Sequence, residues 1–175
     1  MNSLLIKNTS AVITCDSKDT VMEHANLLIN NGVISYIGPE AQTADETLDA
    51  SGYLVYPGLI NTHHHLYQTF SRNLPQVQNM ELFDWLTTLY EIWKNLDQDV
   101  IYHSPITGMG ELLKTGCTTC FDHHYVFPDG NAQFSAAKDL GIRMYASRGS
   151  MDLSKKDGGL PPDSVVQNVE EILRK

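Results

Sequence analysis

The sequence is poor in cysteine, in basic residues and in long apolar runs, and each shortage excludes a class of protein. Three cysteines in 175 residues, an odd number, do not make the disulfide framework of a small secreted domain. Twelve Lys and Arg residues against 21 Asp and Glu residues leave a net charge of −9, which repels a nucleic-acid backbone. No apolar run reaches the roughly 18 residues of a membrane span, and no signal peptide begins the sequence. We therefore expect a soluble, cytoplasmic protein that binds neither nucleic-acid polymers nor membranes.

Several catalytic motifs are also missing. The sequence has no Walker glycine loop, dinucleotide fingerprint or Gly-x-Ser-x-Gly elbow, and it lacks the zinc signature of cytidine deaminases. Cys117 and Cys120 have the spacing of a metal or redox pair, but one pair without a second is weak evidence for either. Their sulfurs face opposite sides of a strand, so we interpret both as small core residues.

Residues 1–56 have the pattern of short strands joined by turns. Asn31-Gly32 between two apolar runs is a strong signal for a β-hairpin. The segment is too short to fold alone, so we expect it to be part of an amino-terminal β-sandwich domain. The expected strands cover residues 4–6, 11–14, 27–29, 33–37 and 53–56.

Residues 57–175 alternate between strand and helix patterns, which is typical of parallel α/β architecture. Helices are predicted over residues 81–95 and 131–140, and another ends at Thr115-Gly116 and is begun or kinked by Pro105. Strands are predicted over residues 117–122 and 142–146. Residues 154–162 resemble a surface loop, and Ser164 begins a further helix. Three strands in all do not close a barrel.

Three consecutive histidines follow an apolar strand. Side chains at positions i and i+2 of a strand share one face, so His63 and His65 converge while His64 points away. Imidazole is a good ligand for zinc. A plain polar strand end is the alternative, but α/β folds place their active sites at the carboxyl ends of parallel strands.

Residues 57–65, Pro-Gly-Leu-Ile-Asn-Thr-His-His-His, resemble the first-strand motif of the amidohydrolase superfamily. The segments 65–68, 82–86, 116–119, 147–151 and 158–164 are most similar to the 8-oxoguanine deaminase and triazine hydrolase branch of that superfamily. The resemblance covers essentially the whole chain. It implies a (β/α)8 barrel, of the TIM type, whose first strands and helices are residues 57–175.

The resemblance implies one divalent metal, zinc, bound by His63 and His65. It also implies hydrolytic deamination of a nitrogen heterocycle, 8-oxoguanine or a related purine or pyrimidine, by metal-activated water. Gln68 is the candidate for hydrogen bonding to the heterocycle, because an amide both donates and accepts. Trp85 is a candidate for stacking on the substrate, although its amphipathic helix favours core packing. Arg148 is a candidate for pairing with substrate or with an acidic side chain.

The resemblance leaves several alternatives open. An s-triazine aminohydrolase or chlorohydrolase and a cyclic amide hydrolase use the same first-strand motif. The superfamily's remaining metal ligands and its acid/base residues belong to later strands, so the catalytic residues are expected beyond Lys175. We therefore expect a fragment that is inactive alone, and the non-enzymatic alternative is a truncated chain that binds metal weakly. His123 or His124 could line the pocket without being a ligand. Self-association into a homo-oligomer stays open.

Overall fold

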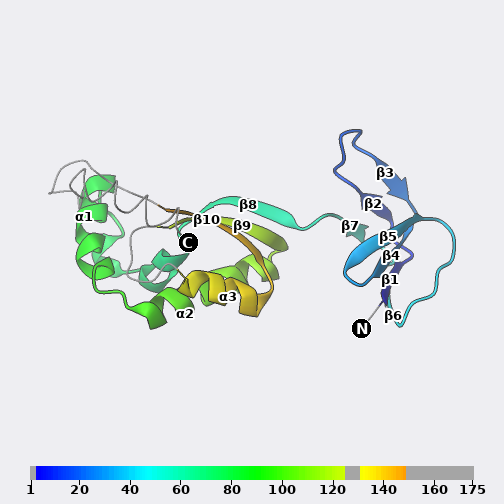
Figure 1. Ribbon diagram of the computed structural model, residues 1–175. Coiled ribbons are helices and arrows are strands. Elements are labelled where there is room, and N and C mark those ends of the chain that lie inside the picture. Colours follow the sequence, from blue (N-terminus) through cyan, green and yellow to red (C-terminus); the bar gives the residue numbers. More distant parts are fainter. Residues whose placement is uncertain (1–2, 125–130, 149–175) are drawn as a thin grey trace. The chain divides into compact units, whose positions relative to one another are not determined.

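The computed structural model describes residues 3–124 and 131–148 (Figure 1). The chain forms two compact units, residues 1–57 and residues 58–175. The loop predicted at residues 154–162 and the helix predicted from Ser164 lie outside the described residues. Within the described part of the chain, no helix has both the length and the apolar character needed to cross a membrane.

The first unit contains two small sheets. The four-stranded sheet has the order β5-β4-β1-β6, and the three-stranded sheet has the order β3-β2-β7. Val12 of the smaller sheet and Leu27 of the larger one share a buried apolar cluster with Ala25. The strands are β1 (Ser3–Lys7), β2 (Ala11–Ile13), β3 (Val21–Glu23), β4 (Asn26–Asn30), β5 (Val33–Gly38), β6 (Glu46–Asp49) and β7 (Leu54–Val55).

The predicted hairpin is confirmed between β4 and β5. Asn31 and Gly32 both have positive φ angles, 50° and 78°, as the tight turns of hairpins require. The short strands β3 and β6 were not predicted from the sequence. Every side chain of β6 is exposed, so this strand lacks the apolar alternation by which strands are recognised.

The second unit has a parallel three-stranded sheet covered by helices, as the sequence predicted. The sheet order is β10-β9-β8, and both pairings are parallel. Figure 1 shows α2 and α3 side by side along the sheet. Its strands are β8 (Leu59–His64), β9 (Cys117–His124) and β10 (Arg143–Arg148); its helices are α1 (Leu82–Trp93), α2 (Gln98–Lys114) and α3 (Ala132–Leu140), with 3-10 turns η1 (Leu66–Ser71) and η2 (Pro75–Val77).

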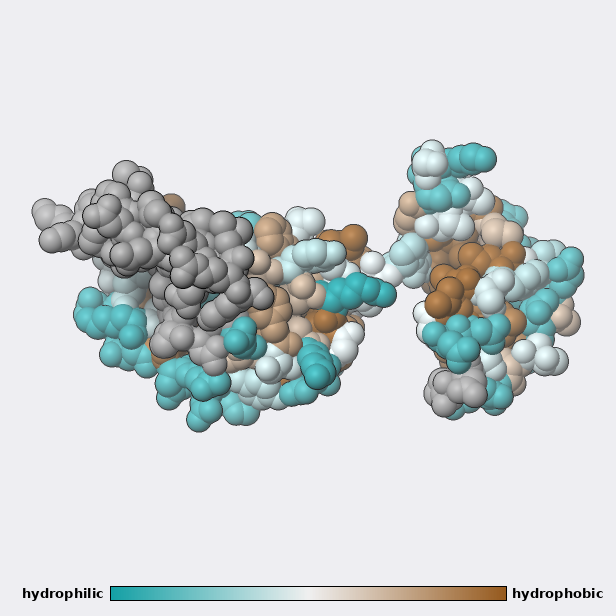
Figure 2. Space-filling model, in the orientation of Figure 1, coloured by the Kyte–Doolittle hydropathy of each residue, from teal (hydrophilic) through white to brown (hydrophobic). Residues whose placement is uncertain are grey.

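Two apolar clusters hold this unit together. Met109 of α2, Cys120 of β9 and Ala136 of α3 are fully buried against Leu66 in one cluster. In the other, Trp93 of α1 packs against residues of η1 and η2. Hydrophobic residues also remain at the surface of each unit in the view of Figure 2.

Helix α2 begins earlier than the sequence suggested. The side chain of Asp97 accepts a hydrogen bond from Val100 N at 2.9 Å and so caps the helix start. Pro105 lies inside the helix, so the expectation that it begins the helix is wrong. The predicted ends are confirmed, because Gly116 and Gly141 have positive φ angles of 92° and 72° after α2 and α3.

The three cysteines are free among the described residues. Cys120 is fully buried, Cys117 is half-buried and Cys15 is exposed. Burial raises the pKa of the Cys120 thiol to about 11. The core interpretation is therefore confirmed for Cys120.

Native thiol labelling should distinguish the buried cysteine from the exposed one. Iodoacetamide at pH 8 should modify Cys15 and leave Cys120 unmodified until the protein is denatured, because only a reachable thiolate reacts. Peptide mass spectrometry identifies the labelled sites, and Cys15→Ser is the control that removes the fast label. Rapid labelling of Cys120 in the native protein would contradict its buried position.

Candidate metal centre

His63 and His65 converge at the carboxyl end of β8. Their Nε2 atoms lie 3.2 Å apart, and His65 directly follows the last residue of the strand. A tetrahedral zinc with Zn–N bonds of about 2.05 Å places two ligand nitrogens roughly 3.3 Å apart. The geometry of this pair therefore fits two ligands of one divalent metal.

The neighbouring strand selects the tautomer of His65. Its Nδ1 lies 2.9 Å from the carbonyl oxygen of His123, and because a carbonyl can only accept, Nδ1 carries the proton. In the neutral ring, Nε2 then presents a lone pair to a metal. The His123 ring lies over the His63 ring, with centroids 4.2 Å apart, and limits how that ring can turn.

His64 does not join the His63–His65 pair, as its place in the strand predicts. The His64 ring instead lies against α2. Its Cε1 is 3.7 Å from the position that a Cβ atom on Gly108 would occupy. Its Nδ1 is buried and has no hydrogen-bond partner among the described residues. Burial lowers the pKa of His64, and the charge of Asp122 opposes that shift.

Asp122 of β9 holds the residue that follows His65. This side chain is fully buried, and its Oδ1 accepts a hydrogen bond from Leu66 N at 2.9 Å. Its Oδ2 lies 3.6 Å from Nδ1 of His124. The sequence analysis gave Asp122 no role. Its signal in the sequence is a carboxylate at the end of the strand predicted over residues 117–122.

A cavity of about 440 Å³ lies beside the histidine pair. This volume suits a small heterocycle. Arg72 and Glu111 line it and form a bidentate ion pair, with both N–O distances 2.7 Å. The hydrogen bond from Arg72 lowers the pKa of Glu111. Neither residue was singled out by sequence reasoning, because 39 residues separate them.

Gln68 and Trp85 both line this cavity, as expected of substrate-contacting residues. The Gln68 Nε2 donates a hydrogen bond to the Tyr67 hydroxyl at 3.2 Å. Burial raises the pKa of Tyr67 to about 12, so the hydroxyl is neutral at physiological pH. Trp85 also packs edge-on against Trp93, with ring centroids 5.6 Å apart. Its cavity position and its core packing therefore coexist.

Arg148 and a third metal ligand are not found among the described side chains around the histidine pair. Arg148 is the last residue of β10 and pairs in register with His124, but its side chain is not among those described. Across residues 3–124 and 131–148, no group of three or more His, Cys, Asp or Glu side chains could hold a metal. The pair thus offers two ligands, whereas catalytic zinc usually has three from the protein.

Replacing Asp122 tests how much its hydrogen bond to Leu66 N, at the start of η1, stabilises this unit. Asp122→Ala should lower the free energy of unfolding by about 1–3 kcal/mol, because the buried Leu66 N–H loses its acceptor. Asp122→Asn retains an acceptor oxygen and should cost less. Urea unfolding followed by tryptophan fluorescence reports this unit, since both tryptophans, Trp85 and Trp93, belong to it. Equal stability of Asp122→Ala and the unmodified protein would contradict this role.

Known proteins resemble this chain along almost its full length. It is 40% identical over 182 residues to an 8-oxoguanine deaminase from Pseudomonas aeruginosa, covering 99% of the chain and 40% of the relative. It is 33% identical to a hydroxydechloroatrazine ethylaminohydrolase from Pseudomonas sp. (strain ADP), covering 99% of the chain and 40% of the relative. The chain therefore spans about 40% of the length of these relatives.

Solved structures give the same result. The atrazine chlorohydrolase TrzN from Arthrobacter aurescens, complexed with zinc, matches with a TM-score of 0.81 and 32% identity, covering 98% of this chain and 43% of that one. The model of the amidohydrolase family matches residues 54–175, which include the histidine pair, the cavity and all three parallel strands. The chain is a member of the amidohydrolase family.

Proposed function

We propose that this chain forms the metal-binding amino-terminal part of an enzyme that hydrolytically deaminates a nitrogen heterocycle, with 8-oxoguanine or a related purine or pyrimidine as substrate. The observation that carries the proposal is the convergence of His63 and His65 beside a cavity that suits a small heterocycle. The 40% identity to an 8-oxoguanine deaminase favours that substrate class.

His63 and His65 would hold one divalent metal, zinc. The protonated Nδ1 of His65 leaves its Nε2 free to bind, and zinc is present in the related TrzN structure. A divalent ion held by this pair would supply the activated water that hydrolysis of the heterocycle requires. We propose that the remaining ligands and the acid/base groups lie outside the described residues, because two imidazoles alone hold a catalytic metal poorly.

Gln68 would bind the polar edge of the heterocycle. Its amide can donate and accept, which matches the mixed edge of an oxidised purine. Trp85 offers an aromatic face or edge to the same cavity. Arg148 would be a further residue that pairs with the substrate, because it ends β10 in register with His124, at the same sheet edge as the carboxyl end of β9.

The proposed protein architecture follows from the same resemblance. The parallel sheet and helices of residues 57–175 would be the first part of a (β/α)8 barrel, and residues 1–56 would be part of a β-sandwich domain. The sheet supports this interpretation, because Phe121 and Tyr145 form a cross-strand pair in register and both are exposed. These apolar side chains would face the barrel interior.

A second candidate function is hydrolysis of an s-triazine, by release of an amine or of chloride. The observation that favours it is the match to TrzN and to the ethylaminohydrolase. Cyclic amide hydrolysis is a third use of the same metal pair. The non-enzymatic alternative is that the 175-residue chain binds metal weakly and has no activity.

Ammonia release tests the metal pair and the substrate class together. A zinc-loaded full-length protein containing this chain should release ammonia from 8-oxoguanine, and His63→Ala or His65→Ala should lower kcat/KM by more than about 100-fold, because each removes a metal ligand. Zinc content should fall in both variants. His103→Ala, in α2 and not among the residues lining the main cavity, is the matched control.

The same assay separates the alternatives. Guanine, isocytosine and a hydroxytriazine run beside 8-oxoguanine compare the substrate classes. Preference for the triazine would favour the second candidate, and full activity with His63→Ala would contradict the metal assignment. Activity of the isolated 175-residue chain would contradict the proposal that other residues complete the site.

Gln68→Ala tests the substrate contact. Loss of one hydrogen bond should lower kcat/KM by about 10-fold to 100-fold while zinc content stays unchanged. The matched control is Gln78→Ala, whose side chain also lines the cavity but donates to the backbone carbonyl of Leu74. Equal effects of the two substitutions would contradict a specific role for Gln68.

A further inference from the structure

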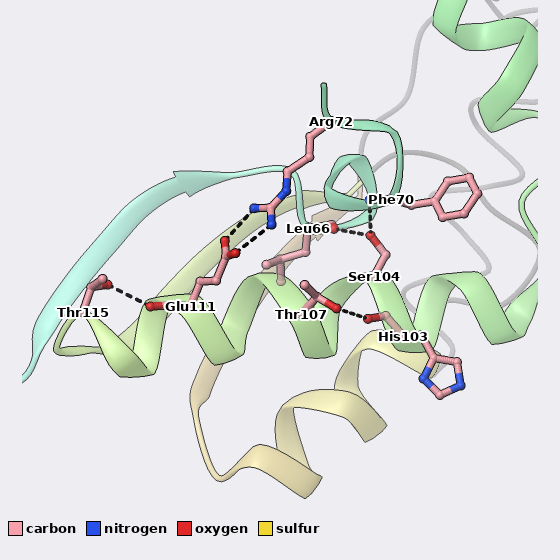
Figure 3. A network of polar contacts seen from close by, with 8 residues as sticks. All are labelled: Leu66, Phe70, Arg72, His103, Ser104, Thr107, Glu111 and Thr115. Atoms are coloured by element: carbon pink, nitrogen blue, oxygen red, sulfur yellow. Dashed lines mark hydrogen bonds and ion pairs between the residues drawn. The ribbon is translucent and has the colours of Figure 1, made fainter. Parts of the chain in front are cut away.

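We infer that Ser104, Gly108 and Glu111 of α2 are positioning residues that hold η1, and with it Gln68, beside the metal pair. This inference rests on the proposed function for the role of Gln68. The three residues occupy positions i, i+4 and i+7 of one helix, so they form a stripe on a single face. Figure 3 shows Ser104 and Glu111 directed toward η1 and Arg72.

The segment η1 depends on contacts from outside. It is a six-residue 3-10 helix, and its N-cap residue, His65, makes no side-chain capping bond. Such helices are short and have poorer hydrogen-bond geometry than α-helices. Its beginning is held by Asp122 at Leu66 N, and its end is held by Trp93, whose Nε1 donates to Ser71 Oγ at 2.8 Å. Between these two points the segment packs against Ser104 and Gly108 of α2.

Ser104 connects the beginning of η1 to its later part through hydrogen bonds. The side chain is buried, and its hydroxyl is placed to donate to the carbonyl oxygen of Leu66 at 2.8 Å while accepting from Phe70 N at 2.9 Å. A single hydroxyl thus joins backbone groups on either side of Gln68. An alanine at this position would leave both groups without this partner.

Gly108 allows α2 to approach η1 closely. A Cβ atom built on Gly108 would lie 2.9 Å from Thr69 Oγ1 and 3.1 Å from Leu66 Cδ2. Leu66 is fully buried and has little room to move. Gly110 in the same helix has no atom within 4 Å of its built Cβ. The two glycines therefore form a matched pair, of which only one faces η1.

Glu111 fixes the residue where η1 ends. Its carboxylate makes two hydrogen bonds to the guanidinium of Arg72, the C-cap residue. Both side chains are about half exposed, so the pair contributes little to stability. Its fork geometry instead defines the orientation of Arg72. The Glu91–Lys94 pair at the carboxyl end of α1 is an exposed ion pair outside α2 and η1, and it serves as a control.

Placement of Gln68 matters because a misplacement of about 1 Å can cost on the order of 100-fold in rate. Substitutions of Ser104, Gly108 or Glu111 should therefore act through Gln68 rather than through the metal. A purely structural role would instead lower stability or metal content, with the same effect whether or not Gln68 is present. This difference makes the inference testable.

The test combines hydrogen exchange with a double-mutant cycle in the full-length, zinc-loaded protein. Ser104→Ala and Gly108→Ala should each speed amide exchange within residues 66–71 by at least about tenfold, whereas Glu111→Gln, which breaks a half-exposed ion pair, should speed it less. Each of the three substitutions should lower kcat/KM by about tenfold, with zinc content unchanged. In a Gln68→Ala background, the same substitutions should change kcat/KM less than about twofold. Glu91→Gln and Gly110→Ala should leave both measurements unchanged.

Two results would overturn the inference. Unchanged exchange within residues 66–71 would show that α2 does not hold the segment. Equal losses of kcat/KM with and without Gln68 would show that the stripe does not act through Gln68. Absence of activity toward every heterocycle in the unmodified protein would instead contradict the proposed function, and the exchange measurement would still decide whether α2 holds η1.

Discussion

The candidate site depends on the parallel pairing of β8 with β9. The register of this pair shifts between Asn61 and His64, so β8 contains one more residue than β9 across that interval. Such irregularities redirect side chains at strand ends. Asn61 stabilises this one, because its side chain accepts a hydrogen bond from His63 N at 3.1 Å. The result places His65 beside the carbonyl of His123 and the backbone of Leu66 beside Asp122.

Successive side chains of β9 point to opposite faces of the sheet, and the two faces make different contacts. Cys120 and Asp122 are buried and share one face, and Cys120 packs in the cluster formed with α2 and α3. Phe121 and His123 lie on the opposite face, where His123 stacks on His63. One face of the strand thus fixes the sheet to its helices. The other face, together with the strand's backbone, orients the metal pair.

Local patterns predicted much of this arrangement from the sequence. Helical periodicity predicted α1, Asn31-Gly32 predicted the hairpin, and the i, i+2 rule brought His63 and His65 together. The contacts that support the site were not predicted. Asp122 and Leu66 are 56 residues apart, and Ser104 and Leu66 are 38 apart. Only the folded chain shows which polar side chain meets which backbone group, so sequence spacing carries no signal for these pairs.

The proposed metal ligands and the proposed substrate contact are supported by different elements. The backbone and ring of His123, in β9, orient His65 and His63, whereas Ser104 and Glu111, in α2, contact η1 and Arg72. A substitution in α2 can therefore move Gln68 without moving the imidazole pair. Under the proposed function, β9 sets the geometry of the first two metal ligands, and α2 sets the orientation of η1 independently of it.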